Sequence, residues 1–162
     1  MRGTKLNGVN IIVTAEIIVT AINANAETNK FANALVRLGV EKGDRVFLFL
    51  DRIPEQYIAL FGTLKVGAIC GPLFSAFGPD PVRDRLQDSG AVVLVTQPDL
   101  RRRIAEIFPG LPALKHIIIV NKDDRDKEPL DSGDHSYETL MDDASTSYWN
   151  PAGLVYVDGK GV

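Results

Sequence analysis

The run Arg45–Leu50, RVFLFL, decides the fold, because nearly every side chain in it is apolar. A strand with one solvated face alternates apolar and polar residues, whereas an unbroken apolar run of this length is typical of a strand buried on both faces. Ala91–Thr96 (AVVLVT) and His116–Val120 (HIIIV) have the same character, and Ala68–Leu73 is a shorter run interrupted by Gly71-Pro72. We expect these segments to be the strands of one sheet.

Segments with helical periodicity alternate with these strands. The first predicted helix ends at Gly39, and the second begins at Pro54 and stops at Gly67. Their apolar stripes recur at i, i+4 and i+7, and they are Phe31, Leu35 and Leu38 in the first helix and Tyr57, Phe61 and Leu64 in the second. An amphipathic helix buries such a stripe, so we expect both stripes to face the core.

Two further helices are expected between the later strands. One begins at Pro79 and closes at Gly90, and the other is capped by Asp99 and stopped by Pro109-Gly110. Their apolar positions are Val82 and Leu86 in the first and Leu100, Ile104 and Ile107 in the second. Repeated strand–helix units of this length predict an α/β fold, in which helices cover both faces of a mainly parallel sheet.

This α/β pattern covers residues 24–120, and the remaining residues 121–162 differ in character. Asn121–Asp134 (NKDDRDKEPLDSGD) is charged and rich in turn-forming residues, which predicts an exposed loop. A short helix around Ser136–Asp143 is expected to follow, and Gly153–Val157 is a possible strand. We therefore treat the α/β part and the final part as separate regions of the chain.

Residues 1–23 form a divergent segment of their own. Its apolar stretch Val9–Ala21 follows two early basic residues and precedes small ones, an order that resembles a secretory signal. Glu16 interrupts this stretch, however, and the β-branched runs Asn10–Thr14 and Ile17–Thr20 favour a short hairpin instead. Both interpretations stay open. No run approaches the ~20 apolar residues that a membrane-spanning helix needs.

Composition excludes several classes of function. The chain has 162 residues, 24% of them charged, with a formal net charge of −3. This charge argues against a general affinity for nucleic acids or anionic membranes. Cys70 is the single cysteine, so an internal disulfide is impossible and a reducing, cytoplasmic compartment is expected. His116 and His135 are distant in sequence and accompany no cysteine cluster, so a zinc site has no support. Nothing in the sequence predicts an oligomeric state.

Three longer stretches carry a family resemblance. TNKFANALVRLGVEKGDRVFLFL (Thr28–Leu50), PEQYIALFGTLKVGAICGPLFSAFGPDPVRDRLQDSGAVVLVT (Pro54–Thr96) and LPALKHIIIV (Leu111–Val120) closely resemble acetyl-CoA and related acyl-CoA synthetases of the adenylate-forming superfamily. LKVGAICGPL (Leu64–Leu73) is similar to an early word of the whole superfamily. GPLFSAFGP followed by RDRLQDS is similar to the acetate-type enzymes. The resemblance implies the N-terminal portion of an acetate–CoA ligase or a close acyl-CoA ligase.

The resemblance also implies a reaction and its cofactors. A carboxylate attacks the α-phosphate of ATP to give acyl-AMP and pyrophosphate, and the thiol of CoA then displaces AMP. ATP, CoA and Mg²⁺ are the implied ligands, the metal ion offsetting phosphate charge. In the family, the phosphate loop, the adenine site and a catalytic lysine lie mostly downstream of the matched words.

The end of the sequence departs from this pattern. NPAGLVY (Asn150–Tyr156) resembles the lead-in to the phosphate loop, but VDGKGV follows in place of a Ser/Thr/Gly-rich run, leaving only Lys160-Gly161-Val162. A phosphate site needs several aligned backbone N–H groups. We expect an incomplete form that is inactive by itself, contains no catalytic residue and binds no cofactor tightly. The alternative is a non-catalytic α/β module that binds CoA or a partner protein.

Two places match positions where acetate-type enzymes meet CoA. Phe74, Ser75 and Ala76 correspond to a segment lining the CoA entrance, although the family more often has glycine at Ser75 and Ala76. Arg102 corresponds to an arginine near the 3′-phosphate of CoA, which a guanidinium binds through charge-assisted hydrogen bonds. The alternatives are a tightly packed strand-to-helix connection and a solvated helix face. Asp51, at the end of a strand, is interpreted as a turn or cap residue.

Overall fold

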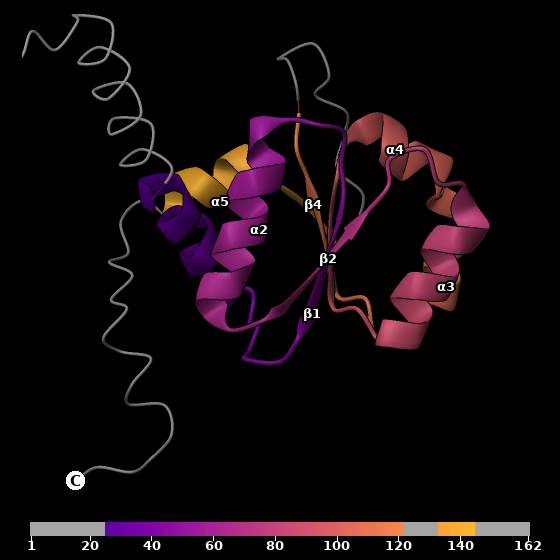
Figure 1. The fold of residues 1–162 in the computed structure, drawn as a ribbon, viewed down its shortest axis with the longest axis horizontal. Coiled ribbons are helices and arrows are strands. Elements are labelled where there is room, and N and C mark those ends of the chain that lie inside the picture. Colours follow the sequence, from indigo (N-terminus) through magenta and orange to yellow (C-terminus); the bar gives the residue numbers. More distant parts are fainter. Residues whose placement is uncertain (1–24, 122–132, 145–162) are drawn as a thin grey trace, which may run out of the picture.

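The computed structural model describes residues 25–121 and 133–144, and it confirms the predicted fold class (Figure 1). The described strands form one five-stranded sheet of order β2-β1-β3-β4-β5, in which every neighbouring pair is parallel. The strands are β1 (Arg45–Phe49), β2 (Ile69–Leu73), β3 (Val93–Thr96), β4 (His116–Ile119) and β5 (Asp134–Ser136). The four strands predicted within the described residues, Arg45–Leu50, Ala68–Leu73, Ala91–Thr96 and His116–Val120, are present as β1 to β4.

Strand β5 was not predicted, because its residues carry none of the apolar signal of the others. Asp134, His135 and Ser136 are polar, and the sequence indicated a loop that leads into a helix here. The strand pairs with β4 through the register Ile117↔Asp134 to Ile119↔Ser136. The backbone ladder and the side-chain contacts of Asp134 and His135 hold this edge strand, rather than apolar burial.

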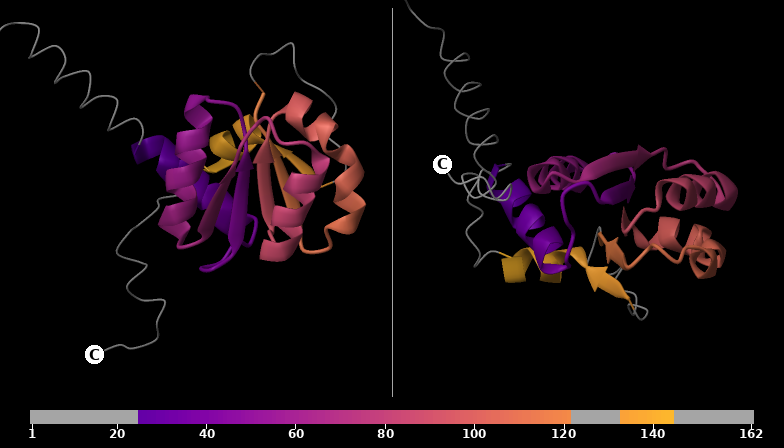
Figure 2. Two further views of the ribbon diagram at one scale, coloured as in Figure 1. Left: turned by 45° about the vertical axis from the view of Figure 1, so that its right-hand side comes forward. Right: turned by 90° about the horizontal axis from the view of Figure 1, so that it is seen from below.

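Helices cover both faces of the sheet in two layers (Figure 2). The described helices are a helix over residues 25–37, α2 (Pro54–Val66), α3 (Pro79–Ser89), α4 (Pro98–Arg103), the 3₁₀-helix η1 (Ala105–Gly110) and α5 (Tyr137–Ala144). Helix 25–37, α2 and α5 pack on one face, where Phe31 and Leu35 are fully buried. Helices α3, α4 and η1 pack on the other face around Phe49 and Leu94.

The prediction that the apolar stripe of α2 faces the core is wrong. Tyr57, Phe61 and Leu64 are 60%, 54% and 53% exposed and point away from the core. The buried face consists of small or β-branched residues, namely Ala59, Gly62, Thr63 and Val66. These permit a close helix crossing, and a Cβ at Gly62 would lie only 2.8 Å from Cδ1 of Phe31. The helix buries its small residues because they allow this close packing. The spacing of the large side chains had predicted that the opposite face is buried.

The predicted helix after β3 is also corrected. Asp99 is not its N-cap, since α4 begins at Pro98 and the N-cap residue is Gln97. Proline is favoured at a first helical position because its missing N–H has no helical partner there. The α-helix ends at Arg103 and continues as η1, which contains Pro109. The predicted apolar positions, Leu100, Ile104 and Ile107, are all buried.

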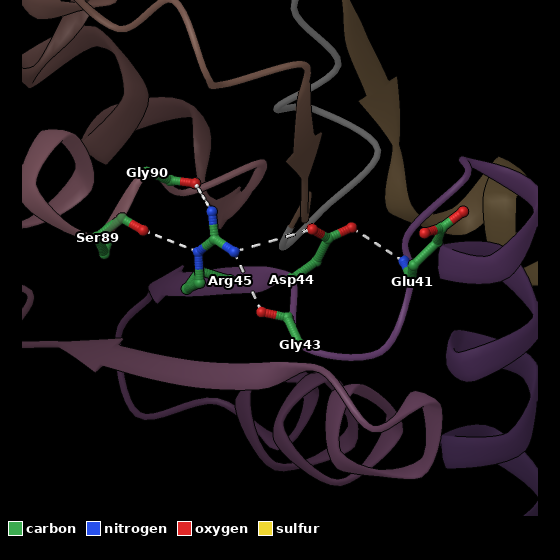
Figure 3. Close-up of polar contacts among 6 residues, drawn as sticks. All are labelled: Glu41, Gly43, Asp44, Arg45, Ser89 and Gly90. Carbon is green, nitrogen blue, oxygen red and sulfur yellow. Dashed lines mark hydrogen bonds and ion pairs between the residues drawn. The ribbon is translucent and has the colours of Figure 1, made fainter. Parts of the chain in front are cut away.

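Arg45, the first residue of β1, forms hydrogen bonds with the carboxyl-terminal end of α3 (Figure 3). Its Nε donates to the carbonyl of Ser89 at 2.8 Å and its Nη2 donates to the carbonyl of Gly90 at 2.8 Å. Its Nη1 donates to the carbonyl of Gly43 at 3.1 Å, and Asp44 lies 4.0 Å away. The guanidinium therefore satisfies terminal carbonyls of α3 and complements the negative end of its dipole.

Several predicted features lie outside the described residues: the hairpin or secretory signal within residues 1–23, most of the loop Asn121–Asp134, the lead-in Asn150–Tyr156 and the strand Gly153–Val157. Within the described ranges, no helix has both the length and the apolar character needed to cross a bilayer.

Candidate functional site

The carboxyl ends of the described strands meet at one edge of the sheet, because all of them are parallel. The strand order reverses between β1 and β3, which is the position where open α/β sheets generally bind ligands. Asp51 follows β1 and Gln97 follows β3, and the backbone N–H of Asp51 donates to Oε1 of Gln97 at 2.8 Å. The contact ties the two loops together at the switch point.

Residues 74–78 connect β2 to α3 at the same edge, and they include the predicted entrance residues. Phe74 is exposed, and its ring meets the ring of Phe77 edge to face, with centroids 5.8 Å apart. The guanidinium carbon of Arg85 lies 4.6 Å from the centroid of Phe77. Ser75 is half-buried and Ala76 is exposed. The loop therefore presents an ordered aromatic pair with small residues between its rings.

Each arginine of the run on α4 has a different partner. Arg101 forms an ion pair with Asp134 of β5, with Nε and Oδ2 2.6 Å apart. Arg102 forms an ion pair with Asp99 one turn earlier on the same helix. Arg103 donates from Nη1 to the carbonyl oxygen of Ser75 at 2.6 Å. Helix α4 is thus braced against β5 on one side and against loop 74–78 on the other.

The structure places the arginine run of α4 beside the loop that contains Phe74, Ser75 and Ala76 through a residue that the sequence did not single out. Arg103, rather than Arg102, contacts the predicted entrance loop. The run of three arginines was the available signal, but sequence spacing alone does not show which of them reaches Ser75. Arg102 is exposed, and an exposed ion pair of the kind it makes with Asp99 contributes little stability.

Cys70 is half-buried, and burial raises the pKa of its thiol to about 11. A thiol with this pKa is almost entirely protonated near neutrality and is a poor nucleophile. Cys70 packs, partly buried, against the core on the face that helix 25–37 and α2 cover.

The two histidines, distant in sequence, meet where β4 and β5 pair. Nδ1 of His116 lies 3.0 Å from Nε2 of His135. Burial lowers the pKa of His116 and the neighbouring His135 lowers it further, while a hydrogen bond to the carbonyl of Leu38 acts in the opposite direction. In residues 25–121 and 133–144, no group of three or more His, Cys, Asp or Glu side chains could hold a metal ion.

Comparison with known proteins agrees with the fold and with the motifs. Residues 9–157 match the AMP-binding enzyme family. Acetyl-coenzyme A synthetase of Bacillus subtilis is 50% identical over 95 residues, which are 58% of this chain and 16% of that protein. Acetyl-coenzyme A synthetase of Nostoc linckia is 30% identical over 162 residues, covering 90% of this chain and 48% of its own sequence.

A solved structure supports the same relationship. The crystal structure of an anthranilate CoA ligase in complex with anthranoyl-AMP superposes with a TM-score of 0.67 at 28% sequence identity, over 74% of this chain and 22% of that one. The chain therefore spans less than half the length of each of these relatives. Because the family match extends over most of its residues and the fold agrees, the chain belongs to the AMP-binding enzyme family.

Proposed function

We propose that this chain is the N-terminal portion of an AMP-forming acetate–CoA ligase, or of a closely related acyl-CoA ligase. The 50% identity to an acetyl-coenzyme A synthetase over 95 residues supports the acetate branch. The observation that carries the proposal furthest is the contact between Arg103 and Ser75, because it holds the arginine run of α4 against loop 74–78. The exposed Arg102 follows Arg101 and precedes Arg103 in this run, so it is offered here as the cation that meets the ligand.

That ligand is CoA, and the described residues bind and orient it. Arg102 would pair with the 3′-phosphate, since a guanidinium forms bidentate, charge-assisted bonds with phosphate oxygens. Phe74, Ser75 and Ala76 would line the path along which the thiol approaches. In the second half-reaction that thiol, after losing its proton to solvent, attacks the acyl carbon of acyl-AMP and forms the C–S bond of the thioester. The phosphate oxygen of AMP leaves with the electron pair of the broken C–O bond.

ATP and Mg²⁺ belong to the first half-reaction, and we assign their binding to other parts of the protein. Mg²⁺ is held by oxygen ligands, often carboxylates together with substrate phosphates. We also propose a cytoplasmic location, which a lone, half-buried cysteine and the use of ATP and CoA favour.

A chimaeric enzyme tests this function without assuming where the natural protein ends. The segment of the Bacillus subtilis synthetase that matches this chain is replaced by the corresponding residues within 25–121. Acetate-dependent exchange of pyrophosphate into ATP reports the first half-reaction, and acetyl-CoA formation reports the second. We expect both to persist. The same graft from the acetyl-coenzyme A synthetase of Pseudoalteromonas translucida, 40% identical to this chain over 84 residues, controls for grafting damage. An active control beside an inactive chimaera would contradict the proposal.

A further inference from the structure

We propose that the outer face of α2 is a docking surface for the chain's own N-terminal segment, Val9–Ala21. This surface, the α2 outer stripe, consists of Tyr57, Phe61 and Leu64, each more than half exposed. Large apolar side chains at i, i+4 and i+7 lie on one side of a helix. A solvated helix face normally carries charged or polar residues at these positions, and a contiguous apolar stripe marks an interaction site.

The start of the described chain is fixed beside this stripe. Lys65, the residue after Leu64, donates from Nζ to Oδ1 of Asn25 at 2.7 Å and to Oγ1 of Thr28 at 2.8 Å. It also donates to Oδ1 of Asn29. The first turn of helix 25–37 is therefore held against the last turn of α2. Any residue that precedes Asn25 begins its path next to the carboxyl-terminal end of the stripe.

The segment Val9–Ala21 is close enough to Asn25 along the chain to reach the α2 outer stripe. Residues 22–24 separate Ala21 from Asn25, and a linker of this size spans at most about 10 Å when extended. The stripe from Tyr57 to Leu64 is itself only about 10 Å long, at 1.5 Å of helix rise per residue. A segment tethered at Asn25 can therefore lie along the whole stripe.

The chemistry of the segment fits the surface. Val9–Ala21 reads VNIIVTAEIIVTA, in which Glu16 is the single charged residue. Isoleucine and valine side chains lose water when they pack on aromatic rings, and this is the favourable term that a docking event needs. The family match also begins at residue 9, so the segment belongs to the same unit of the family as α2.

Limited proteolysis of the 162-residue chain tests the docking. Thermolysin cleaves before isoleucine, leucine and valine, and we expect its sites within residues 9–21 to be protected relative to a free peptide of that sequence. Phe61→Asp should accelerate cleavage there by about tenfold or more, because the rate follows the population of the undocked segment. Val36→Asp is the matched control, since Val36 is 55% exposed on helix 25–37 and lies outside the stripe. It should leave the protection unchanged.

A second measurement needs no substitution. In the unsubstituted chain carrying labelled isoleucine methyl groups, nuclear Overhauser effects should connect Ile11, Ile12, Ile17 or Ile18 with the ring of Phe61. Immediate cleavage of residues 9–21 in the parent would overturn the proposal. So would equal cleavage of the two aspartate variants, or ring contacts that appear only between molecules in a mixed-label sample, because the stripe would then be free or covered by a second copy.

Discussion

The ion pair between Arg101 and Asp134 joins α4 to β5, with Nε and Oδ2 2.6 Å apart. The two side chains are only 17% and 4% exposed. The guanidinium carbon of Arg101 also lies 5.1 Å from the ring centroid of Phe108 in η1. One arginine therefore connects a helix, a 3₁₀-helix and an edge strand that has no apolar side chain of its own.

Asp134→Asn should destabilise the fold, because it leaves the guanidinium of Arg101 without its buried counter-charge. Breaking a buried ion pair from one side typically costs about 3 kcal/mol or more. The matched control is Asp99→Asn, which makes the same chemical change in the pair with Arg102, where the carboxylate is 84% exposed. That change should cost under about 1 kcal/mol. Urea unfolding measures both, and equal midpoints for the two variants would contradict the structural role of Asp134.

Arg45→Met should weaken the connection between β1 and the end of α3. It removes the donors to the carbonyls of Ser89 and Gly90 and leaves those oxygens poorly satisfied. We expect a loss of about 2 kcal/mol in the free energy of unfolding. Arg83→Met removes only exposed ion pairs, those with Asp80 and Asp84, and should change stability by less than about 1 kcal/mol. If the Arg45 variant were as stable as the Arg83 variant, the hydrogen bonds from Arg45 to Ser89 and Gly90 would contribute nothing to stability.

Gly62→Ala should destabilise the chain even though alanine favours helices. The new Cβ would lie 2.8 Å from Cδ1 of Phe31 and 3.0 Å from the carbonyl oxygen of Thr28, and a backbone atom cannot move aside cheaply. Overpacking of this kind costs about 1–3 kcal/mol, which outweighs a propensity gain of about 1 kcal/mol. At Gly78 an added Cβ meets nothing within 4 Å. Thermal unfolding should therefore show a lower midpoint for Gly62→Ala than for Gly78→Ala, and the reverse order would refute the close helix crossing.

The histidine pair predicts a pH dependence of stability. The folded state lowers the pKa of His116 from 6.5, chiefly through burial and then through His135, while Lys115 acts in the same direction. Between the lowered folded value and 6.5, the unfolded chain binds more protons, so stability is complete above 6.5 and falls as the pH decreases below it. His116→Asn should flatten this part of the profile of urea midpoint against pH. His135→Asn should flatten it less, because burial of His116 remains. A profile unchanged by His116→Asn would exclude this residue as the cause.

Sequence patterns predicted the fold well where burial alone determines structure. RVFLFL and AVVLVT are strands because any other placement would expose an unbroken apolar run, and the structure gives β1 and β3 at those places. Sequence patterns failed where a single tertiary contact determines which face of a helix is buried or whether a segment forms a strand. The exposed face of α2 depends on the approach of Phe31 to Gly62, and β5 depends on partners for Asp134 and His135 that are remote in sequence.

The candidate site shows the same limit. Resemblance pointed to Arg102 and to Phe74, Ser75 and Ala76 as separate matches. The structure brings Arg103, the neighbour of Arg102, to the carbonyl of Ser75. A backbone acceptor leaves no trace in the side-chain sequence, so this contact could not be predicted from residue types.

The proposed CoA role is tested most directly by comparing CoA with dephospho-CoA, which lacks the 3′-phosphate, in the chimaeric synthetase described above. Arg102→Ala should raise the Michaelis constant for CoA by about tenfold or more, the equivalent of roughly 1.4 kcal/mol for a lost charge-assisted bond. It should leave the constant for dephospho-CoA and the rate of acetate-dependent pyrophosphate exchange close to the parental values. Equal constants in parent and variant for both coenzymes, or an equal loss for both, would contradict the assignment of Arg102 to the phosphate of CoA.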